Sequence, residues 1–108
     1  MPAPIQLPMA IADCGLDADA FRAQIGRYRA LGATATVRRA SAVQLTAQFT
    51  ADPDPELLRA TIATERECCA FFTLDYAPAD RELTIAVSDP ARAAALDEIQ
   101  AALTATAA

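Results

Sequence analysis

Three cysteines carry the most visible chemistry in this sequence. Cys68 and Cys69 are adjacent within Glu65-Arg66-Glu67-Cys68-Cys69-Ala70-Phe71-Phe72, and Cys14 lies far upstream. Thiolates are ligands that suit Cu(I), Zn²⁺ and other thiophilic ions, and ion binding itself drives their deprotonation. Two neighbouring thiols alone are a poor chelate. We therefore expect a metal or metalloid site only if Cys14 comes close to the Cys68-Cys69 pair.

The absence of histidine narrows the alternatives. The 108-residue chain has no His, so it can build neither a Ser-His or Cys-His catalytic pair nor a His-containing zinc site. The C-terminal end of a helix and the carboxylates of Glu65 and Glu67 disfavour a thiolate at Cys68 or Cys69. We therefore do not expect an enzyme with a cysteine nucleophile.

Two further interpretations of the cysteine pair need to be weighed. A disulfide between Cys68 and Cys69 is not expected, because adjacent helical side chains diverge and a vicinal disulfide requires a strained ring. Free cysteine is among the most buried residue types and often simply fills a core. Buried structural cysteines are therefore the alternative to a metal site, above all for Cys69.

The elements that would position these thiols follow from hydrophobic periodicity. The pattern predicts the order β-α-β-β-α-β-β-α, with strands at 5–11, 34–39, 43–49, 73–76 and 83–87 and helices at 17–31, 54–72 and 90–103. Asp54 and Pro55 are typical of a helix start, and Gly32 is typical of the residue after a helix. The first helix would bury Phe21, Ile25, Tyr28 and Leu31.

This order predicts an α+β fold with an antiparallel sheet covered by helices. Its first six elements match a ferredoxin-like βαββαβ core, to which a strand and a C-terminal helix are added. A second description is two successive α-β-β units closed by a third helix. We expect a single domain over 1–108, with 1–4 and 104–108 frayed.

Glu65 stands out on the second helix. It shares one helical stripe with Leu58, Ile62, Cys69 and Phe72. A carboxylate buried in an apolar stripe needs a partner. The first helix offers Arg22 or Arg29, and we expect Arg29, so Glu65 and Arg29 would support the cysteine site. The alternative is a Glu65 at the rim with its carboxylate in water.

The ferredoxin-like topology gives Cys14 a route to the other thiols. In a βαββαβ arrangement, the end of the first strand and the end of the second helix lie at the same end of the sheet. Cys14 follows the first expected strand directly. Cys14, Cys68 and Cys69 could therefore approach one another although they are distant in sequence.

Charge and composition limit the partners. A net charge of −5 argues against a nucleic-acid-binding protein. No apolar run approaches the roughly 20 residues that span a bilayer, so no membrane association is expected. Met1-Pro2-Ala3-Pro4 does not resemble the start of a signal peptide, so we expect a cytoplasmic protein with reduced thiols.

The segment around the cysteines resembles a family of small, uncharacterised bacterial proteins. The hallmark of that family is E-R-x-C-C-P-F before a strand, and Glu65 to Phe71 match it except that Ala70 replaces the proline. The family also tends to have a Cys before its first helix and an aromatic-Arg-x-Leu near that helix's end. Cys14 and Tyr28-Arg29-Ala30-Leu31 fit these features. The resemblance implies no established activity.

Three functions follow as hypotheses. The first is binding or sensing of a thiophilic metal or metalloid through Cys14, Cys68 and Cys69. The second is a non-enzymatic interaction module that forms a homodimer through a sheet edge or through Phe71-Phe72, with structural cysteines. The third is a thiol-redox protein. The sequence names no cofactor beyond a soft metal ion.

Overall fold

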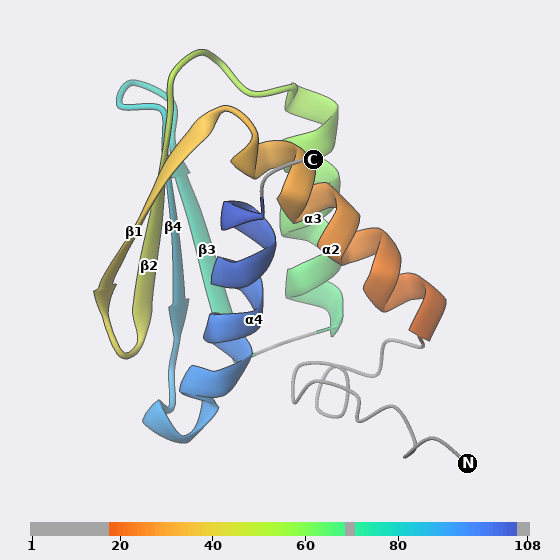
Figure 1. Cartoon of the computed structure of the whole chain (residues 1–108), viewed down its shortest axis with the longest axis vertical. Coiled ribbons are helices and arrows are strands. Elements are labelled where there is room, and N and C mark those ends of the chain that lie inside the picture. Colours follow the sequence, from red (N-terminus) through yellow and green to blue (C-terminus); the bar gives the residue numbers. More distant parts are fainter. Residues whose placement is uncertain (1–17, 69–70, 106–108) are drawn as a thin grey trace.

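The computed structural model describes residues 18–68 and 71–105, and for Cys68 it describes the backbone alone. These residues form helices on one face of a four-stranded sheet (Figure 1). Along the chain the elements are α2 (Ala18–Gly32), β1 (Ala35–Ser41), β2 (Gln44–Phe49), α3 (Pro55–Cys68), β3 (Phe72–Ala77), β4 (Glu82–Val87), the short 3₁₀ helix η1 (Pro90–Arg92) and α4 (Ala93–Thr104). The predicted α+β class with an antiparallel sheet covered by helices is confirmed.

The sheet consists of two hairpins joined side by side. Its strand order is β1-β2-β4-β3, and every neighbouring pair is antiparallel. Burial alternates along β3 and β4, as in Leu83, Ile85 and Val87 of β4, because successive side chains point to opposite faces. One face therefore packs against the helices and the other is more polar.

The sheet order decides between the two descriptions of the topology. In a ferredoxin-like sheet, the first expected strand (5–11) would lie between the strands at 44–49 and 72–77. That place is held by β4, which pairs with β2 on one side and β3 on the other. The described residues thus follow the second description, two α-β-β units closed by a third helix. The expected strand 5–11 lies outside the described residues.

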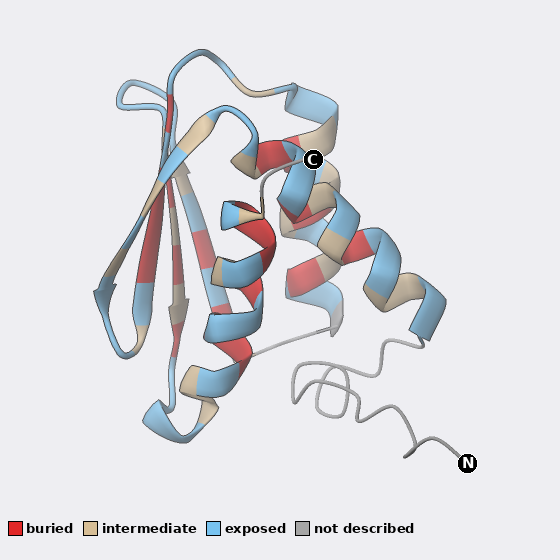
Figure 2. Ribbon diagram, viewed as in Figure 1, coloured by how far each residue is buried: buried red, intermediate tan, exposed pale blue. Residues whose placement is uncertain are grey.

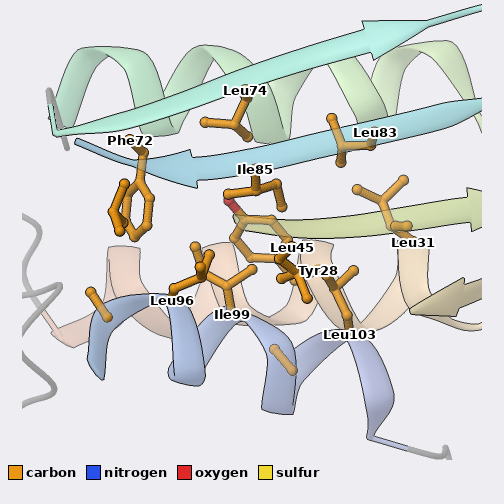
Figure 3. Packing of buried hydrophobic residues seen from close by; sticks show 14 of the residues in the cluster. Tyr28, Leu31, Leu45, Phe72, Leu74, Leu83, Ile85, Leu96, Ile99 and Leu103 are labelled. Carbon is orange, nitrogen blue, oxygen red and sulfur yellow. The ribbon is translucent and has the colours of Figure 1, made fainter. Parts of the chain in front are cut away.

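The core fills the space between the sheet and the three helices (Figure 2). Tyr28 lies within it, among side chains of the sheet and of α4 (Figure 3). The largest completely buried side chains are mostly aliphatic: Leu31, Leu45, Leu74, Leu83, Ile85, Leu96 and Leu103. Burying each such side chain stabilises the fold by about 1.5–3 kcal/mol, which fixes α2 and α4 against the sheet.

The helix boundaries show which local signals were correct. Asp54 caps the start of α3 as predicted, since its carboxylate accepts a hydrogen bond from the Glu56 amide at 3.0 Å. The prediction that this helix continues to Phe72 is wrong. Phe72 instead begins β3, where it pairs with Val87, and the adjacent Phe71 carbonyl accepts a hydrogen bond from the Ser88 amide. Pairing with β4 therefore overrides helical continuation.

Gly32 has a different role from the one predicted. It is the last residue of α2 rather than the residue after the helix. A Cβ at this position would lie 1.8 Å from the Leu103 carbonyl oxygen, so only glycine allows α2 and α4 to approach this closely.

None of the helices in the described part of the chain combines the length and the apolar character that a membrane span requires.

Candidate functional site

A buried polar cluster lies at the interface of α2 and α3. Cys68 is the last residue of α3. The members of the cluster are Gln24 and Tyr28 of α2 and Glu65 of α3, with exposed fractions of 2%, 0% and 4%. Gln24 and Tyr28 are four residues apart, so both project from one face of α2. Glu65 lies on the face of α3 that also buries Leu58 and Thr61. The cluster therefore forms where two amphipathic helices meet.

The hydrogen bonds of this cluster converge on one carboxylate oxygen. The Tyr28 hydroxyl donates to Glu65 Oε1 at 2.8 Å, and Gln24 Nε2 donates to the same atom at 3.2 Å. Gln24 Nε2 also donates to the Thr61 carbonyl at 2.9 Å. Arg27 Nη1 donates to Gln24 Oε1 at 2.8 Å, which orients the amide group so that its NH₂ faces α3.

Burial changes the protonation behaviour of both titratable groups. Removal from water raises the pKa of Glu65 above its ordinary value of 4.5, against the lowering effect of the hydrogen bonds from Tyr28 and Gln24. Burial, followed by the nearby Glu65 carboxylate, raises the pKa of Tyr28 well above 10.0. Tyr28 therefore remains a hydrogen-bond donor to Glu65 under physiological conditions.

Glu65 Oε2 is the unusual atom of the site. It is buried, and no donor among the described residues reaches it. Leaving a buried polar atom without a partner costs about 1–3 kcal/mol, and more when the group is charged. Buried side-chain atoms of this kind are rare, and each calls for a physical explanation. The position therefore has an unused capacity to accept a hydrogen bond or to bind an ion.

The expectation that Arg29 pairs with Glu65 is wrong. Arg29 is exposed, and the hydrogen bonds to Glu65 come from Tyr28 and Gln24. Since adjacent helical residues differ by about 100° in direction, Arg29 points away when Tyr28 points into the core. Arg22 is also exposed and pairs with Asp19. The arginine connected to Glu65 is instead Arg27, through the Gln24 amide.

The three predicted metal ligands are not described by the structure. Cys14 and Cys69 lie outside the described residues, and so does the side chain of Cys68. Within the described residues, no group of three or more His, Cys, Asp or Glu side chains is placed to hold a metal ion. That statement does not cover the side chains of the three cysteines, so their role as ligands stays a prediction.

The described ends of α2 and α3 bear on where Cys14 and Cys68 could meet. The two helices pack against each other and run in opposite directions, so α2 begins at the end of the molecule where α3 ends (Figure 1). The earlier route through a ferredoxin-like first strand loses its basis, because β4 occupies that place in the sheet. The directions of α2 and α3 place only the described start of α2 and the described end of α3 at the same end of the molecule.

The aromatic pair after the cysteines is also constrained. Phe72 is buried in the core, and its ring centroid lies 4.7 Å from that of Phe71. Phe71 is half-buried, and the Arg92 guanidinium lies over its ring at 4.4 Å from the centroid. Phe72 is therefore part of the core, and the expectation of a dimer contact formed by Phe71-Phe72 is wrong for that residue.

Two surface hollows lie elsewhere on the described part of the molecule. One of about 500 Å³ is bordered by α2, β1 and the end of α4, and one of about 380 Å³ lies between α3 and β3. Both are open and mainly apolar, and neither is lined by Glu65. The Glu65 cluster therefore remains the stronger candidate.

Sequence reasoning found Glu65 but missed the two residues that hold it. Glutamine is mostly exposed in proteins, and the stripe of Phe21, Ile25, Tyr28 and Leu31 predicts only an apolar role for Tyr28. The available signal was the spacing of Gln24, Tyr28 and Leu31, which places a polar residue on the buried stripe of α2.

A comparison of the chain with protein-family models, curated proteins and solved structures finds no match.

Proposed function

We propose that this protein binds or senses a thiophilic metal or metalloid ion through Cys14, Cys68 and Cys69. The ion would be held by reduced thiols in the cytoplasm, where thiolate ligands are available. The absence of His leaves cysteine as the main soft ligand of the chain. No catalytic step is part of this proposal.

The observation that supports it best is the antiparallel packing of α2 and α3. Ala18, the first residue of α2, and Cys68, the last residue of α3, belong to helix ends on the same side of the molecule (Figure 1). Cys14 precedes Ala18 by four residues, a length that spans at most about 14 Å. Covalent connectivity therefore limits how far Cys14 can lie from the start of α2, and so favours a meeting with the cysteine pair.

A metal titration tests the proposal. Reduced protein is titrated with Cd²⁺ and with Cu(I), while free thiols are counted in parallel, and the same is done with a Cys14→Ser, Cys68→Ser, Cys69→Ser variant. We expect one ion to protect three thiols, and the triple variant to bind far more weakly. Equal binding by both proteins would sink the proposal.

A sheet-edge dimer is the second candidate, because β1 and β3 are edge strands of the described sheet. Edge strands present unpaired backbone groups that can pair with another chain. On β3, Arg66 already donates to the Leu74 carbonyl at 2.8 Å, so β1 is the more open edge. Sedimentation of the triple cysteine variant without metal tests this candidate: a dimer that persists supports it, and a monomer contradicts it.

A further inference from the structure

The face of the sheet that points away from the helices is covered by none of the described elements. Helices α2, α3 and α4 all lie on the opposite face (Figure 1). Four residues that pair directly across the strands form one row on this outer face: Arg38 of β1, Thr46 of β2, Thr84 of β4 and Asp75 of β3. Directly paired residues share a face of the sheet, so this row crosses the whole sheet.

The row has a positive charge at one end and a negative charge at the other. Arg38 and Asp75 are both exposed, and neither forms an ion pair within the described part of the chain. Three strand spacings separate them, which amounts to roughly 14 Å. Since the Debye length is about 8 Å at physiological ionic strength, the two charges do not neutralise each other within one molecule.

The centre of the row is suited to being covered. Thr46 is only 7% exposed, and its hydroxyl donates a hydrogen bond to the Arg38 carbonyl at 3.4 Å. Gln48, two residues further along β2 on the same face, donates to the Asp80 carbonyl. Polar groups that are already hydrogen-bonded within the sheet need no new partner when water is removed. An uncharged centre with charges at its rim is also typical of a protein interface.

We infer that the outer face of the sheet binds the same face of a second copy of the chain, in a weak symmetric dimer. A two-fold axis that runs along the strands, between β2 and β4 and midway between the two sheets, lays β1 of one copy over β3 of the other. Arg38 of each copy then faces Asp75 of its partner. Stacked sheets lie about 10 Å apart, a gap that an Arg and an Asp side chain together span.

The rest of the face agrees with this arrangement. Glu82 is the third charged residue of the described strands on this face, and it pairs with Gln48 within one sheet. The same two-fold axis places Glu82 opposite the Gln48 of the partner, so no like charges face each other. The surface is therefore complementary to itself in charge, which favours a second copy as its occupant.

The size of the face sets the expected strength of the dimer. Four strands of about six residues cover roughly 400 Å² of sheet, given a strand spacing of about 4.8 Å and a rise of about 3.4 Å per residue. Two copies then bury on the order of 800 Å² in total, which is less than a standard interface buries. The dimer is therefore concentration-dependent, and the charged pairs fix its orientation more than its affinity.

This dimer differs from the sheet-edge dimer considered above, and it does not depend on the cysteines. Pairing through β1 would leave Asp75, on the opposite edge strand β3, at the far side of each copy. A change at Asp75 therefore distinguishes the two arrangements.

The test is sedimentation of the reduced, metal-free, full-length protein at concentrations up to about 1 mM, as a weak interface requires. It compares the wild type with Arg38→Glu, with Asp75→Arg and with an equimolar mixture of the two variants. Each variant alone turns both charge pairs of the dimer into like-charge contacts. In the mixed dimer, the introduced glutamate faces the introduced arginine, and the unchanged Asp75 and Arg38 face each other.

The controls carry the same charge changes on the helical side of the molecule. Arg29→Glu and Glu67→Arg alter exposed residues of α2 and α3. Circular dichroism verifies that every variant is folded. Should a charge reversal fail to fold, Arg38→Gln and Asp75→Asn replace it, and each should raise the dimer Kd at least about 2-fold by removing two exposed ion pairs.

We expect each charge reversal to raise the dimer Kd at least about 10-fold, because like charges that face each other oppose association strongly. The mixture should regain a Kd within about 3-fold of the wild type, and the two controls should stay within the same limit. A wild-type protein that stays monomeric at about 1 mM would overturn the inference, because the face then has another occupant or none. A dimer that Asp75→Arg leaves intact, or a mixture that stays monomeric, would overturn it as well.

Discussion

Replacing Tyr28 with Phe tests whether the Glu65 cluster has the structure described. The substitution removes only the hydroxyl group that donates to Glu65 Oε1 at 2.8 Å, and it leaves the packing of the ring unchanged. A hydrogen bond to a charged group contributes about 1.5–3 kcal/mol. We expect the free energy of unfolding of the apo protein to fall by about 2 kcal/mol at pH 7. With an m value of about 2 kcal/mol per M, the urea midpoint would fall by about 1 M.

The chain's other tyrosine supplies the control. Tyr76 is half-buried and its ring packs edge-on against Phe49, with centroids 6.2 Å apart. Within the described residues its hydroxyl makes no hydrogen bond, so Tyr76→Phe should change the stability by less than about 0.5 kcal/mol. The Tyr28→Phe deficit should also shrink in acid, where Glu65 is protonated and accepts a weaker hydrogen bond. Equal destabilisation by the two substitutions would refute the described cluster.

Three further predictions concern stability measured by urea denaturation. Gly32→Ala should destabilise the fold by about 1–3 kcal/mol, because the added Cβ meets the Leu103 carbonyl. Gly26→Ala should stabilise the fold by about 0.4–1 kcal/mol, because a Cβ at that position meets no atom within 4 Å. A change of the same sign in both variants would contradict the described packing of α2 against α4. The free energy of unfolding of the wild type should fall as the pH rises from 4.5 to the raised pKa of Glu65, since Glu65 keeps its proton to a higher pH in the folded state than in the unfolded state. Glu65→Gln should lose this part of the pH dependence. Asp54→Ala should cost about 1 kcal/mol through loss of the α3 cap, and no loss would exclude that role.

Local patterns predicted most of the elements because each has a local cause. Alternating residues such as Val43 to Phe49 indicate a strand, and Asp54 followed by Pro55 indicates a helix start. The place of β4 between β2 and β3 has no such local cause, because it depends on how two hairpins associate. The ferredoxin-like expectation took the neighbours of β2 from a known pattern and therefore placed the wrong strand beside it.

In the candidate site, too, the sequence predicts what has a local cause and does not predict what depends on tertiary packing. The sequence shows that Glu65 shares a stripe with apolar residues, and its burial is confirmed. Its partners depend on the rotation of α2 about its own axis, which is set by contacts with α4 and the sheet. That rotation turns Gln24 and Tyr28 inward and leaves Arg29 exposed. A small difference in helix rotation thus replaces an expected ion pair with a neutral donor pair, and among the described residues Glu65 Oε2 has no hydrogen-bond partner.

X-ray absorption at the zinc edge of the Zn²⁺-loaded, reduced protein tests the central claim most directly, because it counts the atoms around the ion. The account predicts three sulfur neighbours at about 2.3 Å, from Cys14, Cys68 and Cys69. A shell made only of oxygen and nitrogen neighbours would contradict it.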